Sequence, residues 1–167
     1  PEVIGTMGQI SSKIHLVENE NDVASLDIKK NDKIAYVTQT TLSVDDTNSI
    51  IQAIKKKYPN VIEPRKDDIC YATTNRQEAV KKIARYCDLF IVIGAKNSSN
   101  SLRLVEVAKQ YGAKKSMLAE KIERFDLKYF KKIKSLGLTA GASAPEILVQ
   151  TFISYLKENF NVILHEK

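Results

Sequence analysis

The chain has 167 residues, 43% of them hydrophobic and 28% charged, and its formal net charge is +6. These values are typical of a globular protein with one domain or two small ones. No apolar run approaches the length that spans a membrane, and the first residues lack the pattern of a secretory leader. We therefore expect a cytoplasmic protein with no membrane partner.

The net positive charge fits either a nucleic-acid surface or a solvated surface rich in lysine. Basic clusters are spread along the sequence, mostly near the ends of expected helices, at residues 55–57, 81–82, 114–115 and 131–132. Cations near the C-terminal end of a helix interact favourably with its dipole. No aromatic residues interleave with these clusters to stack on bases. The sequence therefore favours the solvated surface and predicts no nucleic-acid partner.

Short apolar segments alternate with amphipathic ones along the chain, which predicts an α/β fold with mainly parallel strands. We expect strands at residues 13–17, 33–37, 69–72, 88–93, 115–118 and 136–138. We expect helices at residues 21–26, 44–58, 76–86, 101–111, 126–132 and 145–158. Proline and polar residues at 58–60 and 63–67 give the best boundary signal. The predicted domains are residues 1–66 and 67–150, followed by a helix end and tail at 151–167.

Polar residues follow several of the expected strands, at residues 38–43, 73–75, 97–101 and 139–143. In a parallel sheet such loops gather at one edge, and helix N-termini there can hold an anion such as phosphate. The alternative is ordinary helix capping, because Ser43, Asn75 and Ser143 each precede an acidic residue by three positions. One cap needs one polar residue, whereas residues 97–101 supply five in a row. This excess favours a polar ligand site.

The two cysteines have different predicted environments. Cys87 continues a helically spaced apolar series and is expected in the core. Cys70 is expected at the end of a strand beside the polar loops, where a thiolate would be favoured near a helix start. Its possible roles are a nucleophile, a redox thiol, a metal ligand or a purely structural residue.

Long motifs cover essentially the whole chain: PEVIGTMGQ at residues 1–9, TQTTLSVDDT at 38–47, DDICYATTNRQ at 67–77, KNSSNS at 96–101 and TAGASAPE at 139–146. Together they closely resemble the 4-hydroxy-3-methylbut-2-enyl diphosphate reductase family, also called LytB. This family removes a hydroxyl group reductively in the last step of non-mevalonate isoprenoid biosynthesis, giving isopentenyl and dimethylallyl diphosphate. The resemblance implies three α/β lobes in a trefoil arrangement, of which residues 1–66 would be a truncated middle lobe and residues 67–150 the C-terminal lobe.

The resemblance also implies roles for individual residues. Cys70 would be one of three cysteines, one from each lobe, that hold a 4Fe–4S cluster. Glu2 would supply protons to the substrate. Without the resemblance, Glu2 would be interpreted as an acid in the first turn of a helix, where it stabilises that helix. Thr40 would help to position the substrate and relay the proton. The residues implied in diphosphate binding are Thr40, Ser98, Ser99, Asn100 and Ser143.

The implied partners are an allylic diphosphate substrate, an electron donor such as ferredoxin or flavodoxin, and an N-terminal lobe that this chain lacks. That lobe would carry the other two cluster cysteines and the histidines beside the diphosphate. His15 and His165 lie in no matching motif and are interpreted as incidental. Because one thiolate cannot secure a four-iron cluster, we expect the chain alone to hold no iron and to be inactive. The alternative function is a non-enzymatic phosphate-binding α/β module derived from the enzyme.

Overall fold

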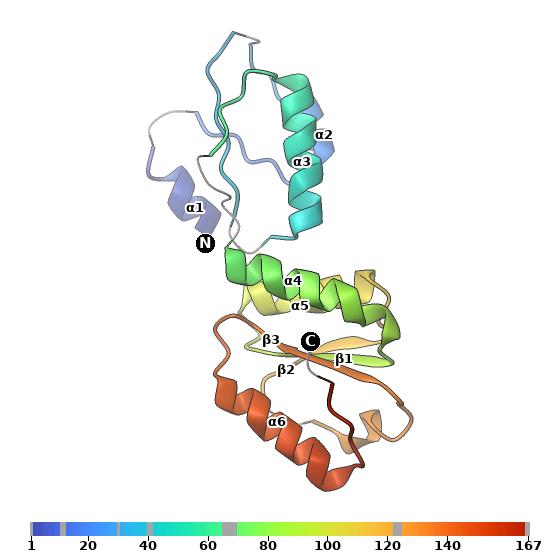
Figure 1. The fold of residues 1–167 in the computed structure, drawn as a ribbon. Helices are drawn as coiled ribbons and strands as arrows, with labels where there is room; N and C mark the ends of the chain where they lie inside the picture. Colours follow the sequence, from blue (N-terminus) through green and yellow to red (C-terminus); the bar gives the residue numbers. More distant parts are fainter. Residues whose placement is uncertain are drawn as a thin grey trace. The chain divides into compact units, whose positions relative to one another are not determined.

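The computed structural model describes residues 2–10, 13–29, 31–39, 42–64, 70–121 and 125–165, without the side chains of Glu2 and Leu127. The chain forms two compact units, Pro1–Cys70 and Tyr71–Lys167 (Figure 1). The predicted domain boundaries at residues 66 and 150 stay predictions.

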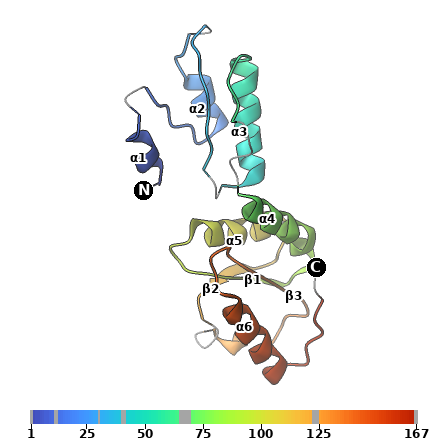
Figure 2. The ribbon, with the colours of Figure 1, turned by 60° about the vertical axis from the view of Figure 1, so that its left-hand side comes forward.

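The first unit contains three helices among its described residues: α1 (Glu2–Met7), α2 (Glu20–Ser25) and α3 (Val44–Lys57). Ser43 caps α3 as predicted, because its side chain accepts a hydrogen bond from the backbone N–H of Asp46 at 3.3 Å. Helices α2 and α3 lie side by side (Figures 1 and 2). Lys57 joins them, since its Nζ donates hydrogen bonds of 2.7 to 3.0 Å to three carbonyls at the end of α2.

The strands predicted at residues 13–17 and 33–37 are wrong. The described residues of the first unit contain only a single parallel bridge, between Ala35 and Ile62. A lone pair of short extended segments is at best marginally stable, because it gains few ladder hydrogen bonds and buries little apolar surface. The segment before residues 38–43 is therefore not a strand in the structure.

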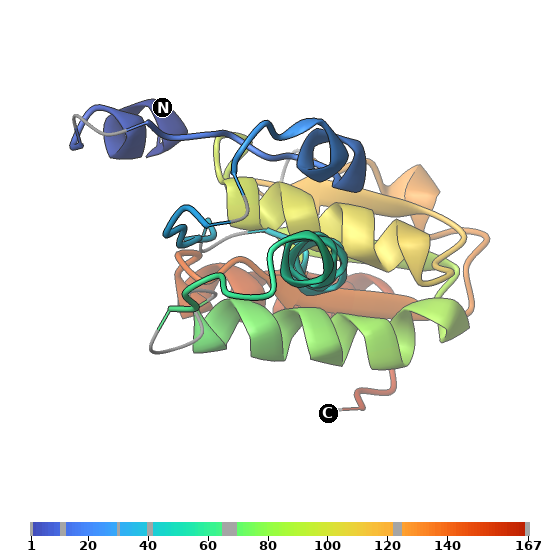
Figure 3. The same ribbon diagram turned by 90° about the horizontal axis from the view of Figure 1, so that it is seen from above.

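The second unit is built on a parallel sheet in the order β2-β1-β3, formed by β1 (Leu89–Ile93), β2 (Ser116–Ala119) and β3 (Leu136–Ala140). Every residue of the central strand β1 is apolar and buried, as expected for a parallel strand covered on both faces. Helices α4 (Tyr71–Ile83) and α5 (Ser99–Gln110) cover one face, and α6 (Glu146–Asn159) covers the other (Figures 1 and 2). Figure 3 shows α4 and α5 running side by side.

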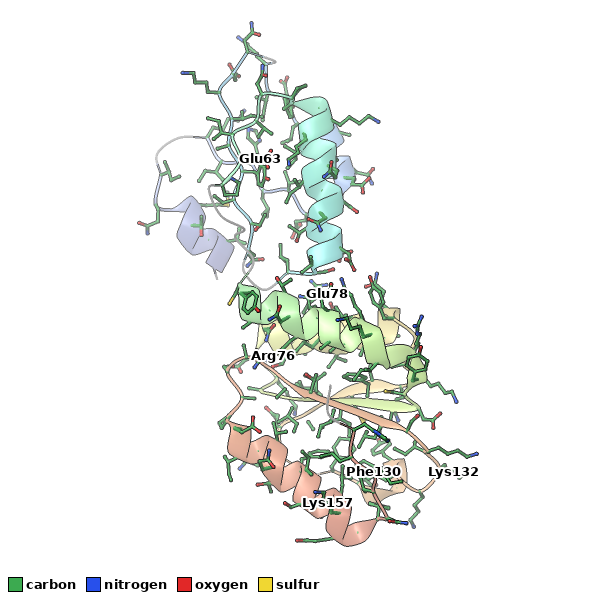
Figure 4. All side chains as sticks on the ribbon, viewed as in Figure 1. Glu63, Arg76, Glu78, Phe130, Lys132 and Lys157 are labelled. Carbon is green, nitrogen blue, oxygen red and sulfur yellow. The ribbon has the colours of Figure 1, made fainter. Side chains whose placement is uncertain are left out.

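The sheet separates two hydrophobic cores. On one face, Phe90 and Val92 pack with Leu104 of α5 and Val80 of α4. On the other face lies an aromatic cluster that includes Phe130, which Figure 4 labels between the sheet and α6. Both faces of β1 are therefore buried, which holds its carboxyl end firmly in place.

The mixed α/β fold with a parallel sheet is confirmed, and the strands predicted at residues 88–93, 115–118 and 136–138 are present within one or two residues of their expected ends. The strand predicted at residues 69–72 is wrong, because α4 already begins at Tyr71; residues 65–69 lie outside the described part. The buried residues Thr73, Gln77 and Val80 follow one another at helical spacing. Residues 73–75 therefore belong to a helix, so Asn75 does not begin one.

The helix predicted at residues 126–132 is also wrong. The described residues there form only a short 3-10 turn, η3 (Leu127–Tyr129). The segment instead supplies aromatic rings to the core, where Phe130 lies 6.5 Å from Phe152 and 5.5 Å from Phe160 between ring centroids. Three of the four residues at 131–134 are lysines, so this segment offers few apolar positions for a longer amphipathic helix.

Candidate functional site

The loop between β1 and α5 carries the densest group of predicted site residues. Ser98 is the N-cap of α5, and its Oγ accepts hydrogen bonds from the backbone N–H of Ser101 at 3.3 Å and from the Ser101 hydroxyl at 3.0 Å. Ser99 and Asn100 form the first turn of the same helix. The start of a helix of this length presents backbone N–H groups and partial positive charge, both of which favour an anion.

Asn100 differs from an ordinary residue of a first helical turn. Its side chain is only 7% exposed, and neither Oδ1 nor Nδ2 has a hydrogen-bond partner among the described residues. Leaving a buried polar group unpaired costs roughly 1–3 kcal/mol. An amide in this state is ready to bind a ligand that brings its own polar atoms.

The loop after β3 lies against the same helix start. A Cβ on Gly141 would overlap the Ser101 Oγ and would lie 3.8 Å from Asn100 Nδ2. A Cβ on Gly94, directly after β1, would overlap the same hydroxyl oxygen. The two glycines therefore allow the ends of β1 and β3 to close around the first turn of α5.

Ser143 lies in this second loop, two residues beyond Gly141, and its side chain is exposed. The prediction that it caps α6 is wrong, because the N-cap is Pro145 and no side chain caps the helix start. The carboxyl edge of the sheet therefore carries Ser98, Ser99 and Asn100 on one loop and Ser143 on the next.

Glu120 is a residue of this edge that the sequence did not single out. It follows β2 directly, and its carboxylate accepts a hydrogen bond from the backbone N–H of Lys96 at 3.2 Å. The Lys96 Nζ lies 3.5 Å from the other carboxylate oxygen, with the lysine side chain 81% exposed. Such an exposed ion pair contributes little to stability. The hydrogen bond from the Lys96 backbone N–H is therefore the main contact between Glu120 and the loop that carries Ser98. Its position after a strand is the signal that could have identified it.

The remaining predicted residues belong to the first unit. Cys70 is exposed and directly precedes α4, so the prediction that it ends a strand is wrong. Glu2 is the first residue of α1, and its side chain lies outside the description, as does the whole of Thr40. The structure therefore brings together the residues of the second unit only.

Cys87 is buried in the core beside Phe90, as predicted. Its thiol donates a hydrogen bond to the Ile83 carbonyl at 3.3 Å, and burial, with a smaller effect of Asp88, raises its pKa. This thiol is a structural residue. None of the helices within the described ranges is both long and apolar enough to span a membrane.

These features define the class of protein: an α/β protein whose parallel sheet presents polar loops, a helix start and an unpaired buried amide at its carboxyl edge. Such an edge is suited to a polar, anionic ligand. The model of the LytB protein family matches residues 1–157, and the chain belongs to this family.

Relatives in sequence and in structure agree with this assignment. The 4-hydroxy-3-methylbut-2-enyl diphosphate reductase of Actinobacillus succinogenes is 53% identical over 161 residues, which cover 95% of this chain and 51% of the relative. The reductase of the same name from Escherichia coli is 49% identical over 161 residues, again 95% of this chain and 51% of the relative. The chain therefore spans about half the length of the curated relatives it matches.

Among solved structures, the E-1-hydroxy-2-methyl-but-2-enyl-4-diphosphate reductase from Plasmodium falciparum superimposes with a TM-score of 0.86 at 42% sequence identity. The superposition covers 93% of this chain and 49% of that protein. The fold of the chain is thus that of about half of a LytB reductase.

Proposed function

We propose that this chain is the diphosphate-binding part of a 4-hydroxy-3-methylbut-2-enyl diphosphate reductase of non-mevalonate isoprenoid biosynthesis. The observation that carries the proposal is the buried, unpaired amide of Asn100 at the start of α5, within the segment that matches the LytB family. The names of the relatives include a hydroxymethylbutenyl diphosphate as the compound those enzymes reduce, and this supports an allylic diphosphate as the substrate class.

The residues of the carboxyl edge suit a diphosphate chemically. The Ser98 hydroxyl, the Asn100 amide N–H and the first backbone N–H groups of α5 are neutral donors, and several of them can converge on phosphate oxygens. Neutral donors bind an anion without the cost of burying additional lysines. Ser99 and Ser143 are exposed at the same edge and would complete the set of donors. Hydrogen bonds to a charged group are the stronger kind, so a bond from Asn100 Nδ2 to the anion would offset the cost of leaving that N–H group unpaired.

The residues of the first unit have proposed roles that rest on the family resemblance. Glu2 would supply protons to the substrate, and Thr40 would position it. Cys70 would bind one iron of a 4Fe–4S cluster, since its thiol is exposed. When bound, such a cluster would supply electrons and an iron site for the substrate hydroxyl.

The described residues do not by themselves fit a four-iron cluster. They contain no group of three or more His, Cys, Asp or Glu side chains placed to hold a metal ion. A cluster of this kind needs several thiolates. The remaining ligands would come from an N-terminal lobe, and electrons from a carrier such as ferredoxin or flavodoxin. We infer that the 167-residue chain alone is inactive as a reductase.

Anaerobic cluster reconstitution tests this proposal. The chain is reconstituted alone and together with the N-terminal lobe of a LytB reductase, and iron content and reduction of 4-hydroxy-3-methylbut-2-enyl diphosphate are measured. We expect iron and activity only in the mixture, and loss of both with Cys70→Ala. A folded complex that binds diphosphate but holds no iron and shows no reductase activity would favour the non-enzymatic phosphate-binding module instead.

A further inference from the structure

Ser101 is a buried polar residue to which neither the family resemblance nor the proposed function gives a role. It lies in the first turn of α5, and its side chain is 1% exposed. Gly94 after β1 and Gly141 after β3 both leave the room that its hydroxyl occupies. Ser101 thus lies where the two site loops meet the helix.

The hydrogen bonds of Ser101 determine what Ser98 can do. Ser98 Oγ accepts two hydrogen bonds, from the backbone N–H of Ser101 at 3.3 Å and from the Ser101 hydroxyl at 3.0 Å. A hydroxyl oxygen has two lone pairs and one proton. With both lone pairs occupied, Ser98 keeps only its proton for a further partner, so it can act only as a donor. A phosphate oxygen is an acceptor and matches that donor.

The simpler interpretation is that Ser101 only fills space between two glycines. Alanine would fill almost the same space without burying a hydroxyl, and a buried hydroxyl costs free energy unless it is hydrogen-bonded. The described residues show the Ser101 hydroxyl donating to Ser98 Oγ. The hydroxyl therefore has a specific partner, and that partner belongs to the candidate site.

We propose that Ser101 is a positioning residue that acts through Ser98: its hydroxyl holds the Ser98 hydroxyl as a hydrogen-bond donor toward the bound diphosphate. This inference rests on the proposed diphosphate site. Removing the Ser101 hydroxyl would free one lone pair of Ser98 Oγ and let the Ser98 proton rotate to other acceptors. The backbone bond from Ser101 to Ser98 would remain, so the cap of α5 would be preserved.

A double-mutant cycle on the 167-residue chain tests the inference, with inorganic pyrophosphate as the probe in calorimetric titrations. The variants are Ser98→Ala, Ser101→Ala and the combination of both, with Ser154→Ala as a control at an exposed position of α6. We expect Ser101→Ala to weaken binding about threefold to tenfold. Because Ser101 acts through Ser98, the double variant should bind no more weakly than Ser98→Ala alone.

Other outcomes overturn the inference in distinguishable ways. If Ser98→Ala weakens binding but Ser101→Ala does not, the role of Ser101 is wrong and the diphosphate site stands. If the losses of the two single variants multiply in the double variant, Ser101 acts independently of Ser98, as a structural residue would. If Ser98→Ala itself binds like the unmodified chain, the proposed site fails as well. Should Ser101→Ala not fold, Ser101→Gly also lacks the hydroxyl, adds no atom and takes its place in the cycle.

Discussion

At the scale of single residues, Asn100 carries a buried amide that is unpaired among the described residues. Leucine has a similar shape but no polar atoms, so it removes the cost of the unpaired group and is a good helix former. We expect Asn100→Leu to raise the free energy of unfolding by roughly 1 kcal/mol while weakening pyrophosphate binding. Urea unfolding with and without pyrophosphate measures both effects. A variant that is clearly less stable than the parent would show that the amide has a structural partner.

The glycines that face Ser101 give a second prediction at this scale. A Cβ on Gly141 would overlap the Ser101 Oγ, so Gly141→Ala must displace the first turn of α5 or the end of β3. Overpacking of this kind costs about 1–3 kcal/mol. The matched control is Gly5→Ala in α1, where a Cβ would meet nothing within 4 Å. Thermal and urea unfolding should show a loss for Gly141→Ala only, and equal stability of both variants would contradict the close packing.

The serine and asparagine residues of the site could be predicted from the sequence because they form an unusually long polar run after a buried strand. The place of Glu120 after a strand was readable from the sequence, but its contact with Lys96 and the role of the two glycines were not. Two of these contacts join loops that are far apart in the sequence, Glu120 with Lys96 and Gly141 with Ser101, while Gly94 approaches Ser101 within one loop. Such contacts depend on the strand order, which the local pattern does not contain.

At the scale of elements, Asp88 joins the starts of the three strands. Its carboxylate accepts hydrogen bonds from Lys114 Nζ at 2.6 Å before β2, and from the backbone N–H groups of Lys134 at 2.8 Å and Ser135 at 3.2 Å before β3. The Lys114 side chain, followed by the Lys134 backbone N–H, holds the pKa of Asp88 well below its ordinary value of 3.8. The amino edge of the sheet is thus tied together by one carboxylate.

This arrangement predicts a pH dependence of stability. A carboxyl group whose pKa is lowered by folding stabilises the protein above its unfolded pKa, and that stability is lost as the pH falls toward the folded pKa. The contribution of Asp88 should therefore be complete above about pH 4 and decline below it. We expect the midpoint temperature of thermal unfolding to decrease as the pH is lowered below about 4. In Asp88→Asn this decrease should be less steep. Identical acid slopes for the two proteins would contradict the role of Asp88.

The start of α4 shows why one predicted element was wrong. The letters Ile-Cys-Tyr-Ala form a short apolar run, which cannot be distinguished from a strand by periodicity alone. The helical spacing of Thr73, Gln77 and Val80 is recognisable only once threonine and glutamine are known to be buried. By contrast, β1 and α5 were predictable because their apolar patterns are strong and agree with their surroundings.

At the scale of the whole molecule, the two cysteines should differ in reactivity. Cys70 is exposed, whereas Cys87 is buried and its pKa is raised by burial. Because the thiolate is the reactive form, a thiol reagent should modify Cys70 at least about tenfold faster than Cys87 in the native chain. Mass spectrometry of partially labelled protein identifies the site. If the thiol reagent modified Cys87 as fast in the native chain as in the urea-unfolded chain, the burial of Cys87 would be contradicted.

The chain spans about half the length of its LytB relatives, and its second compact unit carries the proposed diphosphate site at one edge of the sheet. The long motifs made this family recognisable from the sequence. The proposed cluster and the proposed reduction would also need residues that lie outside the described part of the chain. The proposed anion site, by contrast, lies wholly within the second unit and can be tested on this chain.

Calorimetric titration of the chain and of Asn100→Leu with inorganic pyrophosphate tests this site most directly. We predict saturable binding to one site per chain, weakened about tenfold or more in Asn100→Leu and unchanged in Ser154→Ala. A folded chain that binds no pyrophosphate, or an Asn100→Leu variant that binds it as tightly as the parent, would contradict the proposed site.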